Sequence, residues 1–391
     1  MYSIFVMRKR IIQLAAVLIG LILLSYAAFT VKAPVPKPAE KPANQPAPKT
    51  TVNDLDKEPT EEEKLLALVP EAYRTARDLN VPAGAFISIL LREGDSGFAH
   101  DFERGAKQAC DDLNKMRLYK GDEKVRVTCS APSKDSISTQ SALLDEELAL
   151  YPDVLAVSIT DAAASEVQFD LAMENGIYII GFDAYPQYDG IVATVETDNA
   201  AAAAEAADKL AEAVGEGPVM IVSHDTTSSN LTARESAFVK HLGEQYPQIT
   251  CAVTCHLSDL DGMREEIAAY FNDDADPDND VKPEAATEKD LIAYYLRTHP
   301  ELMGVFAADE GSAELVLDDL LEHTPENDIS VTAFGSSEIL KPYTDDGVLK
   351  YYIEENGYGM GYATAIAAFR LTAQKGNLDK VMIGYTLKPE E

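Results

Sequence analysis

The feature that most constrains the fold of this 391-residue chain is a repeated alternation of short apolar runs with helical segments. In the first unit, residues 85–113, the apolar run 86–91 has the length of a strand buried on both faces. A polar loop follows, and apolar residues then recur at every fourth position from Phe98 to Cys110, as on one face of a helix. Similar units continue to residue 387 in two successive arrays. They predict an α/β protein with two Rossmann-like lobes, each built on a parallel sheet.

The charge balance and the missing motifs narrow the function. The chain has 33 Lys and Arg against 66 Asp and Glu, a net charge of −33, so we expect no nucleic-acid partner. P-loop, nucleophile-elbow, HExxH and dinucleotide-binding patterns are absent from the sequence. Asp161 and Asp183 could act as paired carboxylates in a glycosidase-like enzyme, which is the less favoured alternative. We therefore expect no enzyme, no catalytic residues and no cofactor.

The N-terminal residues have the composition of an export segment. Residues 1–33 contain a basic cluster and then the apolar run 11–29, which fits either a cleaved signal peptide or a membrane anchor. Residues 34–53 are rich in Pro, Ala and Lys and predict an extended linker, which slightly favours the anchor. In the helical extension expected over 54–84, Thr60 and Glu63 have the spacing of a capping box.

The four cysteines of an exported chain permit disulfides. A bond between Cys110 and Cys129 is plausible, because one residue lies late in a helix and the other at the end of the next strand. Cys251 and Cys255 would be too far apart in a straight strand. We expect no metal site, since the acidic insert 272–287 lacks the glycine and glutamate positions of a calcium loop.

Several strand ends carry motifs in a recognisable order. They are ITDAAAS around Asp161, IIGFDA around Asp183, TDNAAAAAEAADKL from Thr197, HPELMGVFAADEGSAELVLDDL from His299, and the segment from Ile329 onward. Together they resemble the sugar-binding proteins of ABC importers, of the ribose and galactose type, whose type I periplasmic-binding fold is also that of the lac-repressor core. The resemblance implies a three-stranded hinge, with crossings near 193–198, 354–356 and 376–380. It places lobe 1 at 85–195 plus 357–378 and lobe 2 at 196–356 plus 379–391.

The same resemblance implies a ligand cleft between the lobes. Carried over residue by residue, the candidate ligand-binding residues are Asp95, Ser96, Phe98, Asp161, Asp183, Tyr185, Arg234, Asp309, Ser336 and Glu355. Phe98, Tyr185 or Tyr358 would supply an aromatic face for a sugar. The chain departs from the family where Ala184 replaces the usual arginine and Gly335 the usual aspartate. With many carboxylates and Arg234 as the one obvious cation, the ligand can be a sugar, a polyol, an amino sugar or another cationic or hydroxyl-rich small molecule.

The sequence thus predicts an exported, monomeric solute-binding protein at the outer face of the cytoplasmic membrane. It would bind a small sugar or polyol by closing two lobes and deliver it to an ABC permease. The alternative is a sensory domain that presents the solute to a membrane kinase or chemoreceptor. A transcription regulator is disfavoured, because an export segment stands where a helix-turn-helix would be needed.

Overall fold

The computed structural model describes residues 58–133, 136–159, 161, 163–272, 282–323 and 328–389. Those from residue 59 onward belong to one compact unit. The expected signal or anchor (1–33) and linker (34–53) lie outside the described residues. Within the described ranges, no helix combines the length and the apolar character that a membrane span requires.

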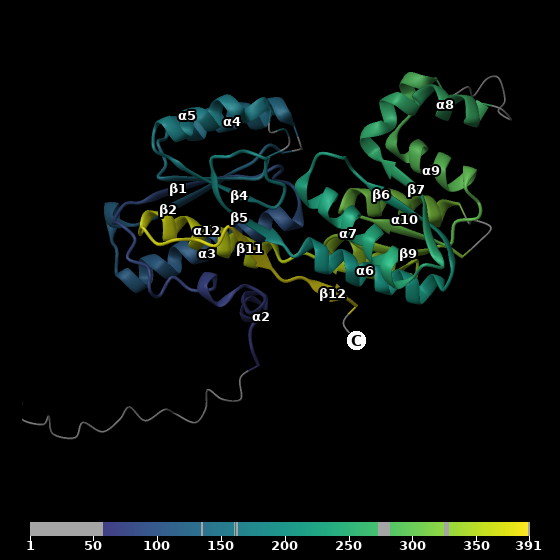
Figure 1. Ribbon diagram of the computed structural model, residues 1–391. Coiled ribbons are helices and arrows are strands. Elements are labelled where there is room, and N and C mark those ends of the chain that lie inside the picture. The colour runs from purple at the N-terminus through teal and green to yellow at the C-terminus, as the bar shows by residue number, and fades with distance from the viewer. Residues whose placement is uncertain are drawn as a thin grey trace, which may run out of the picture. The chain divides into compact units, whose positions relative to one another are not determined.

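The first lobe contains a six-stranded parallel sheet, with the order β11-β5-β4-β3-β1-β2. Helices α3 and α12 cover one face of this sheet, and α4 and α5 cover the other (Figure 1). The bounds are β1 Phe86–Leu90, β2 Arg126–Ser130, β3 Val154–Val157, β4 Tyr178–Phe182, β5 Ile191–Thr197, β11 Lys380–Ile383, α3 Gly97–Arg117, α4 Ile137–Ala149, α5 Glu166–Glu174 and α12 Gly357–Thr372.

The second lobe contains another six-stranded sheet, with the order β12-β10-β9-β8-β6-β7. All its pairings are parallel except that of β12 with β10. Helices α6 and α7 pack on one face, and α8 to α11 on the other. The bounds are β6 Gly217–Ser223, β7 Ile249–His256, β8 Gly304–Ala307, β9 Ser330–Phe334, β10 Leu349–Glu354, β12 Thr386–Lys388, α6 Asn199–Val214, α7 Ser229–Gln245, α8 Leu260–Asn272, α9 Glu288–Thr298, α10 Glu310–Glu322 and α11 Ser337–Asp345.

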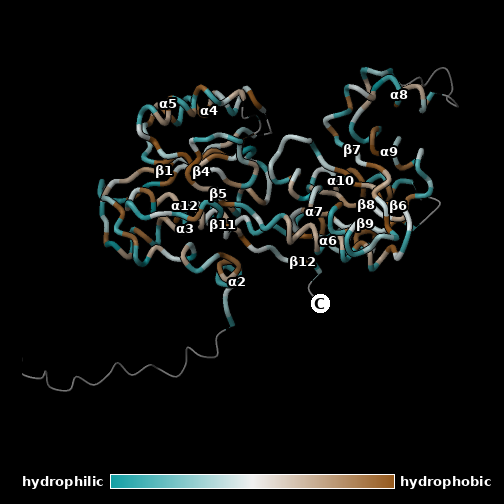
Figure 2. Tube along the Cα trace, in the orientation of Figure 1, coloured by the Kyte–Doolittle hydropathy of each residue, from teal (hydrophilic) through white to brown (hydrophobic). Residues whose placement is uncertain are grey.

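Apolar strands between helical layers account for this architecture. Every residue of β1, β3 and β8 is buried, as expected for parallel strands covered on both faces. Figure 2 shows hydrophobic segments gathered around β1 and β4 inside the first lobe. The predicted α/β class with two parallel-sheet lobes is confirmed.

Helices α3 and α12 cross at two glycines. A Cβ atom added to Gly105 would lie 2.0 Å from the carbonyl oxygen of Tyr358, and one added to Gly361 would lie 2.0 Å from that of Phe102. The two backbones can therefore approach this closely only with glycine at both positions.

The C-terminal residues correct one prediction. We expected a single strand over 381–387 that belongs to the second lobe and follows a crossing near 376–380. Instead, β11 pairs with β5 in the first sheet, and β12 pairs with β10 in the second, so the third crossing lies at 384–385. The break occurs at Gly384, whose N–H donates to Leu68 O (2.9 Å) instead of to a neighbouring strand.

All four cysteines are free, so the Cys110–Cys129 disulfide that we considered plausible is not formed. Cys110 Sγ lies instead 3.2 Å from Val125 O. Cys251 and Cys255 pack against the cores on opposite faces of the second sheet, because a register shift between β6 and β7 falls between them. Burial raises the pKa of Cys110 to about 11 and that of Cys255 to about 12, which leaves these thiols protonated and unreactive.

Candidate functional site

A cavity of about 800 Å³ lies at the carboxyl ends of strands from both sheets. Loops that follow β1, β4, β6, β8, β9 and β10 contribute its lining. In parallel α/β sheets this is the edge at which ligands bind, because side chains from several loops converge there. The volume is within the usual range of small-molecule sites.

The first lobe contributes the start of α3. Ser96 caps this helix, and its Oγ accepts a hydrogen bond from the Ala99 N–H (3.2 Å). Phe98 lies half-buried on the cavity wall, with its ring 6.1 Å from that of Phe102. The phenylalanine is thereby held as an apolar surface beside polar groups.

Asp183 follows β4 with a left-handed backbone (φ 49°), which turns the chain into the cavity. Its Oδ1 accepts a hydrogen bond from Asn230 Nδ2 of the second lobe (2.9 Å). Burial and the negative charge of Glu355 raise the pKa of Asp183 to about 6, although Arg234 and Arg92 act in the opposite direction. Burial and the charge of Glu355 therefore oppose the ionisation of Asp183 more than the two arginines favour it.

Arg234 and Glu355 form an ion pair between α7 and the end of β10. Arg234 Nη2 donates to Glu355 Oε1 (2.5 Å), and the guanidinium also donates to Asn199 Oδ1 (2.7 Å) and Ala308 O (2.9 Å). It lies 4.0 Å from the centre of the Phe334 ring and is only 1% exposed. Thr197 Oγ1 donates to the same oxygen of Glu355 (2.8 Å). Arg234 thus holds Glu355 in place while the glutamate lines the cavity.

Asp309 and Ser336 begin two helices of the second lobe. Asp309 caps α10, where its carboxylate accepts from the N–H of Ser312 (2.9 Å) and the N–H of His224 (2.9 Å). The N–H of Ser336 donates to Glu310 Oε2 (2.5 Å). Its buried Oγ has no hydrogen-bond partner among the described residues, so a ligand hydroxyl could provide one.

The two lobes also contact each other directly beside the cavity. Arg92 of the first lobe donates to Ser228 Oγ (2.7 Å) and pairs with Asp225 (3.3 Å) of the second. Burial alone would raise the pKa of Asp225, but hydrogen bonds from Ser228 and Thr227 and the charge of Arg92 hold it well below its usual range.

Of the ten predicted residues, seven line the cavity: Ser96, Phe98, Asp183, Arg234, Asp309, Ser336 and Glu355. Three do not. Asp95 is exposed to solvent, Asp161 accepts a hydrogen bond from the Ala164 N–H (3.0 Å), and the Tyr185 hydroxyl lies 3.4 Å from Lys380 Nζ. Tyr358 does line the cavity, but it is 3% exposed beneath Arg104 and serves mainly in packing.

Several residues that line the cavity are not among those predicted from the sequence. The expectation of one obvious cation is wrong, because Arg92, Arg104 and Lys388 line the cavity together with Arg234. Asn230 was missed as well, although it lies one helical turn before Arg234 on α7 and so shares its face. Arg92 directly follows the first apolar run, and this place at the end of a strand is the sequence signal that could have identified it as a lining residue.

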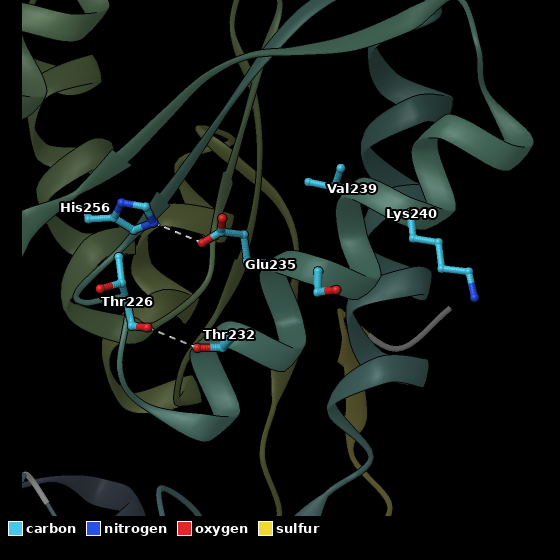
Figure 3. A pocket seen from close by; sticks show the side chains of 7 residues that line it. Thr226, Thr232, Glu235, Val239, Lys240 and His256 are labelled. Atoms are coloured by element: carbon cyan, nitrogen blue, oxygen red, sulfur yellow. Dashed lines mark hydrogen bonds and ion pairs between the residues drawn. The ribbon is translucent and has the colours of Figure 1, made fainter.

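A second hollow, of about 590 Å³, lies beside α7 and the end of β7 (Figure 3). In it, His256 Nε2 is 3.0 Å from Glu235 Oε2, and Thr232 Oγ1 donates to Thr226 O (3.4 Å). None of the ten predicted residues lines this hollow, and its wall comes from one lobe. The cavity lined by both lobes is therefore the candidate site.

Comparison with protein families agrees with this geometry. Residues 87–376 match the family model described as "Periplasmic binding protein domain". The chain belongs to this family of periplasmic binding proteins. Family membership makes it a binding protein and not an enzyme, and implies an extracytoplasmic location.

Solved structures show the same fold at low sequence identity. A solute-binding protein from Agrobacterium vitis, bound with alpha-D-tagatopyranose, is 20% identical, with a TM-score of 0.63 over 78% of this chain and 94% of that one. A carbohydrate transporter solute-binding protein from Agrobacterium radiobacter, in complex with D-arabinose, is 19% identical, with a TM-score of 0.60 and the same coverages. A glucose-galactose binding protein from Geobacillus stearothermophilus is 17% identical, with a TM-score of 0.59 over 78% of this chain and 96% of that one. No curated protein matches the chain in sequence.

The fold of this periplasmic binding protein is therefore the type I fold of those structures, as the sequence motifs predicted.

Proposed function

We propose that this periplasmic binding protein captures a small hydroxylated solute, a sugar or sugar-like molecule, between its two lobes and delivers it to an ABC permease. The observation that carries the proposal is the convergence of Asp183, Asn230 and Glu355 on one cavity at the strand ends of both sheets. Carboxylate and amide groups bind hydroxyls well, because each offers several hydrogen-bonding positions.

The charges favour a neutral or cationic ligand over an anionic one. Each arginine and lysine that lines the cavity is already paired with a carboxylate of the protein: Arg234 with Glu355, Arg92 with Asp225, Arg104 with Asp101 and Lys388 with Glu354. Asp183 and Glu355 bring negative charge into the cavity. Phe98 offers an apolar face for the C–H groups of a sugar ring, and sugars are the ligands named for several solved structures of this fold.

Capture would occur by rotation of the lobes about the three crossings. The contacts of Arg92 with Ser228 and of Asp183 with Asn230 join the lobes at the cavity, where closure would shield the ligand from water. We place the protein at the outer face of the cytoplasmic membrane, tethered by the apolar run 11–29 if that run is not cleaved.

A thermal-shift screen of the full chain tests the proposal with D-arabinose, D-tagatose, D-galactose, glucosamine and ribitol as probes. A millimolar probe at a micromolar site adds about 4 kcal/mol to the free energy of unfolding and raises the melting temperature by several degrees. We expect at least one probe to do so, and Glu355→Gln to reduce the shift. Unchanged melting temperatures with all five probes would contradict the proposed ligand class.

A further inference from the structure

The helix α2 (Glu61–Ala67) precedes the region that matches the family, which begins at residue 87. It nevertheless reaches the candidate site, because Glu61 and Leu65 line the cavity. Figure 1 shows α2 beside α12, against which it packs. A segment outside the family match thus supplies part of the wall of the ligand cavity.

The same segment is bonded to two of the three crossings. At the second crossing, Asn356 Nδ2 donates to Leu65 O (2.7 Å), while Asn356 Oδ1 caps α12 by accepting from the Gly359 N–H (2.7 Å). At the third crossing, the Gly384 N–H donates to Leu68 O (2.9 Å). A Cβ atom at Gly384 would lie 3.2 Å from both Leu68 Cβ and Leu68 O, so the contact is close.

Helix α2 depends on these contacts and on its cap. It has seven residues, none of them buried, and a helix this short is unstable in water by itself. Its capping box is complete: Thr60 Oγ1 accepts from the Glu63 N–H (3.2 Å), and Glu63 Oε2 accepts from the Thr60 N–H (2.8 Å). The residues that follow are firmly placed on the first lobe, with Val69 and Tyr73 buried.

We propose that α2 acts as a latch on the hinge, which restricts lobe opening and so tunes the affinity of the cavity. The inference rests on the proposed function, since it assumes that the lobes move about these crossings. Rotation about residues 356 and 384 changes the backbone torsions of the two donor residues, so the bonds to Leu65 and Leu68 resist it. Each bond therefore favours the lobe arrangement in which it forms, and its loss allows a wider range of arrangements.

Two sets of substitutions weaken the latch in different ways. Asn356→Asp keeps an acceptor for the Gly359 N–H but removes the donor to Leu65 O. Thr60→Ala with Glu63→Ala removes the capping box and frays α2 without touching a crossing. The matched control is Thr287→Ala with Asp290→Ala, which removes the capping box of α9 in the second lobe.

The lobe arrangement is measured in the ligand-free full chain by double electron–electron resonance. Spin labels are placed through Val167→Cys on α5 and Leu321→Cys on α10, at positions that are 69% and 51% exposed. The native thiols compete little for the label, because burial raises the pKa of each to about 11 or 12. Hydrogen exchange of the peptides that contain residues 61–68 and 384 is followed in parallel.

We expect both latch variants to broaden the interlobe distance distribution. They should also accelerate exchange at Gly384 about fivefold, because a loosened α2 weakens the bond that the Gly384 N–H donates to Leu68 O. The α9 control should keep the unmodified distribution. The latch is overturned if both variants keep that distribution while exchange shows α2 to be frayed. Because no ligand is present, this result is independent of the sugar screen, whose failure would overturn the proposed function instead.

Discussion

At the scale of single residues, the site depends on an arginine whose role differs from the expected one. Arg234 lines the cavity, but its guanidinium bonds to Glu355, Asn199 and the Ala308 carbonyl and is buried against Phe334. We infer that it positions Glu355 more than it contacts a ligand.

Arg234→Ala should therefore destabilise the protein strongly. The substitution leaves Glu355 and Asn199 without their buried partner, and breaking a buried ion pair costs about 3–5 kcal/mol. Urea denaturation measures this loss. The control is Arg104→Ala, since Arg104 is about half exposed in its pair with Asp101 and should contribute less than about 1 kcal/mol. Equal, small effects of both substitutions would contradict this role of Arg234.

Asp183 should make stability depend on pH. Its folded-state pKa, about 6, is above the value of 3.8 for an ordinary aspartate, so the folded protein binds the proton more tightly than the unfolded chain. The contribution of Asp183 to stability consequently falls as the pH rises from about 4 to 6.

Asp183→Asn removes this dependence while keeping an acceptor for Asn230. We expect the variant to gain on the order of 2 kcal/mol relative to the unmodified protein between pH 4 and pH 7, as measured by denaturation at both values. A difference between the two proteins that stays constant with pH would contradict the assignment.

Site residues that follow strands could be predicted from the sequence. Site residues whose role depends on contact between the lobes could not. Asp183, Asp309 and Glu355 line the cavity because each comes within two residues of the end of a recognisable strand. Arg92 and Asn230 acquire their roles by reaching across to the other lobe, and no local pattern reports such a contact. Asp161 also follows a strand, but its carboxylate is used in its own turn.

At the scale of elements, the crossing of α3 and α12 forms the centre of the first lobe. Gly361→Ala should destabilise the protein by about 1–3 kcal/mol, because the added methyl group would overlap the Phe102 carbonyl. Thermal denaturation of the variant and the unmodified protein measures this loss of stability. Gly243→Ala on α7 is the matched control: its Cβ meets open space, and alanine should add about 0.5–1 kcal/mol. The prediction fails if both substitutions are stabilising.

Element boundaries were predictable where capping and periodicity agree. The sequence predicts a helix over 199–214, with Asp198 or Asn199 as its cap and Gly215 as its stop, and α6 has these bounds with Asp198 as the cap. The split of 381–387 into β11 and β12 was not predictable, because the apolar pattern continues through the break. The bond from the Gly384 N–H to Leu68 O, which accompanies the break, joins residues far apart in sequence, and no local pattern indicates it.

At the scale of the whole molecule, two similar lobes meet at a polar cavity, and the chain passes between them three times. The family match, the strand-end residues and the interlobe bonds support our proposal that the ligand is captured in this cavity. The N-terminal extension, which precedes the residues that match the family model, contributes a contact to the hinge.

The most direct test of this account is titration calorimetry with the sugar that stabilises the full chain most in the thermal-shift screen. We expect one site per chain, with affinity reduced about 10- to 100-fold in Glu355→Gln, which is the loss expected for hydrogen bonds to a charged group. Asp161→Asn, outside the cavity, should retain the unmodified affinity. Equal affinities in all three proteins would show that the ligand does not bind between the lobes.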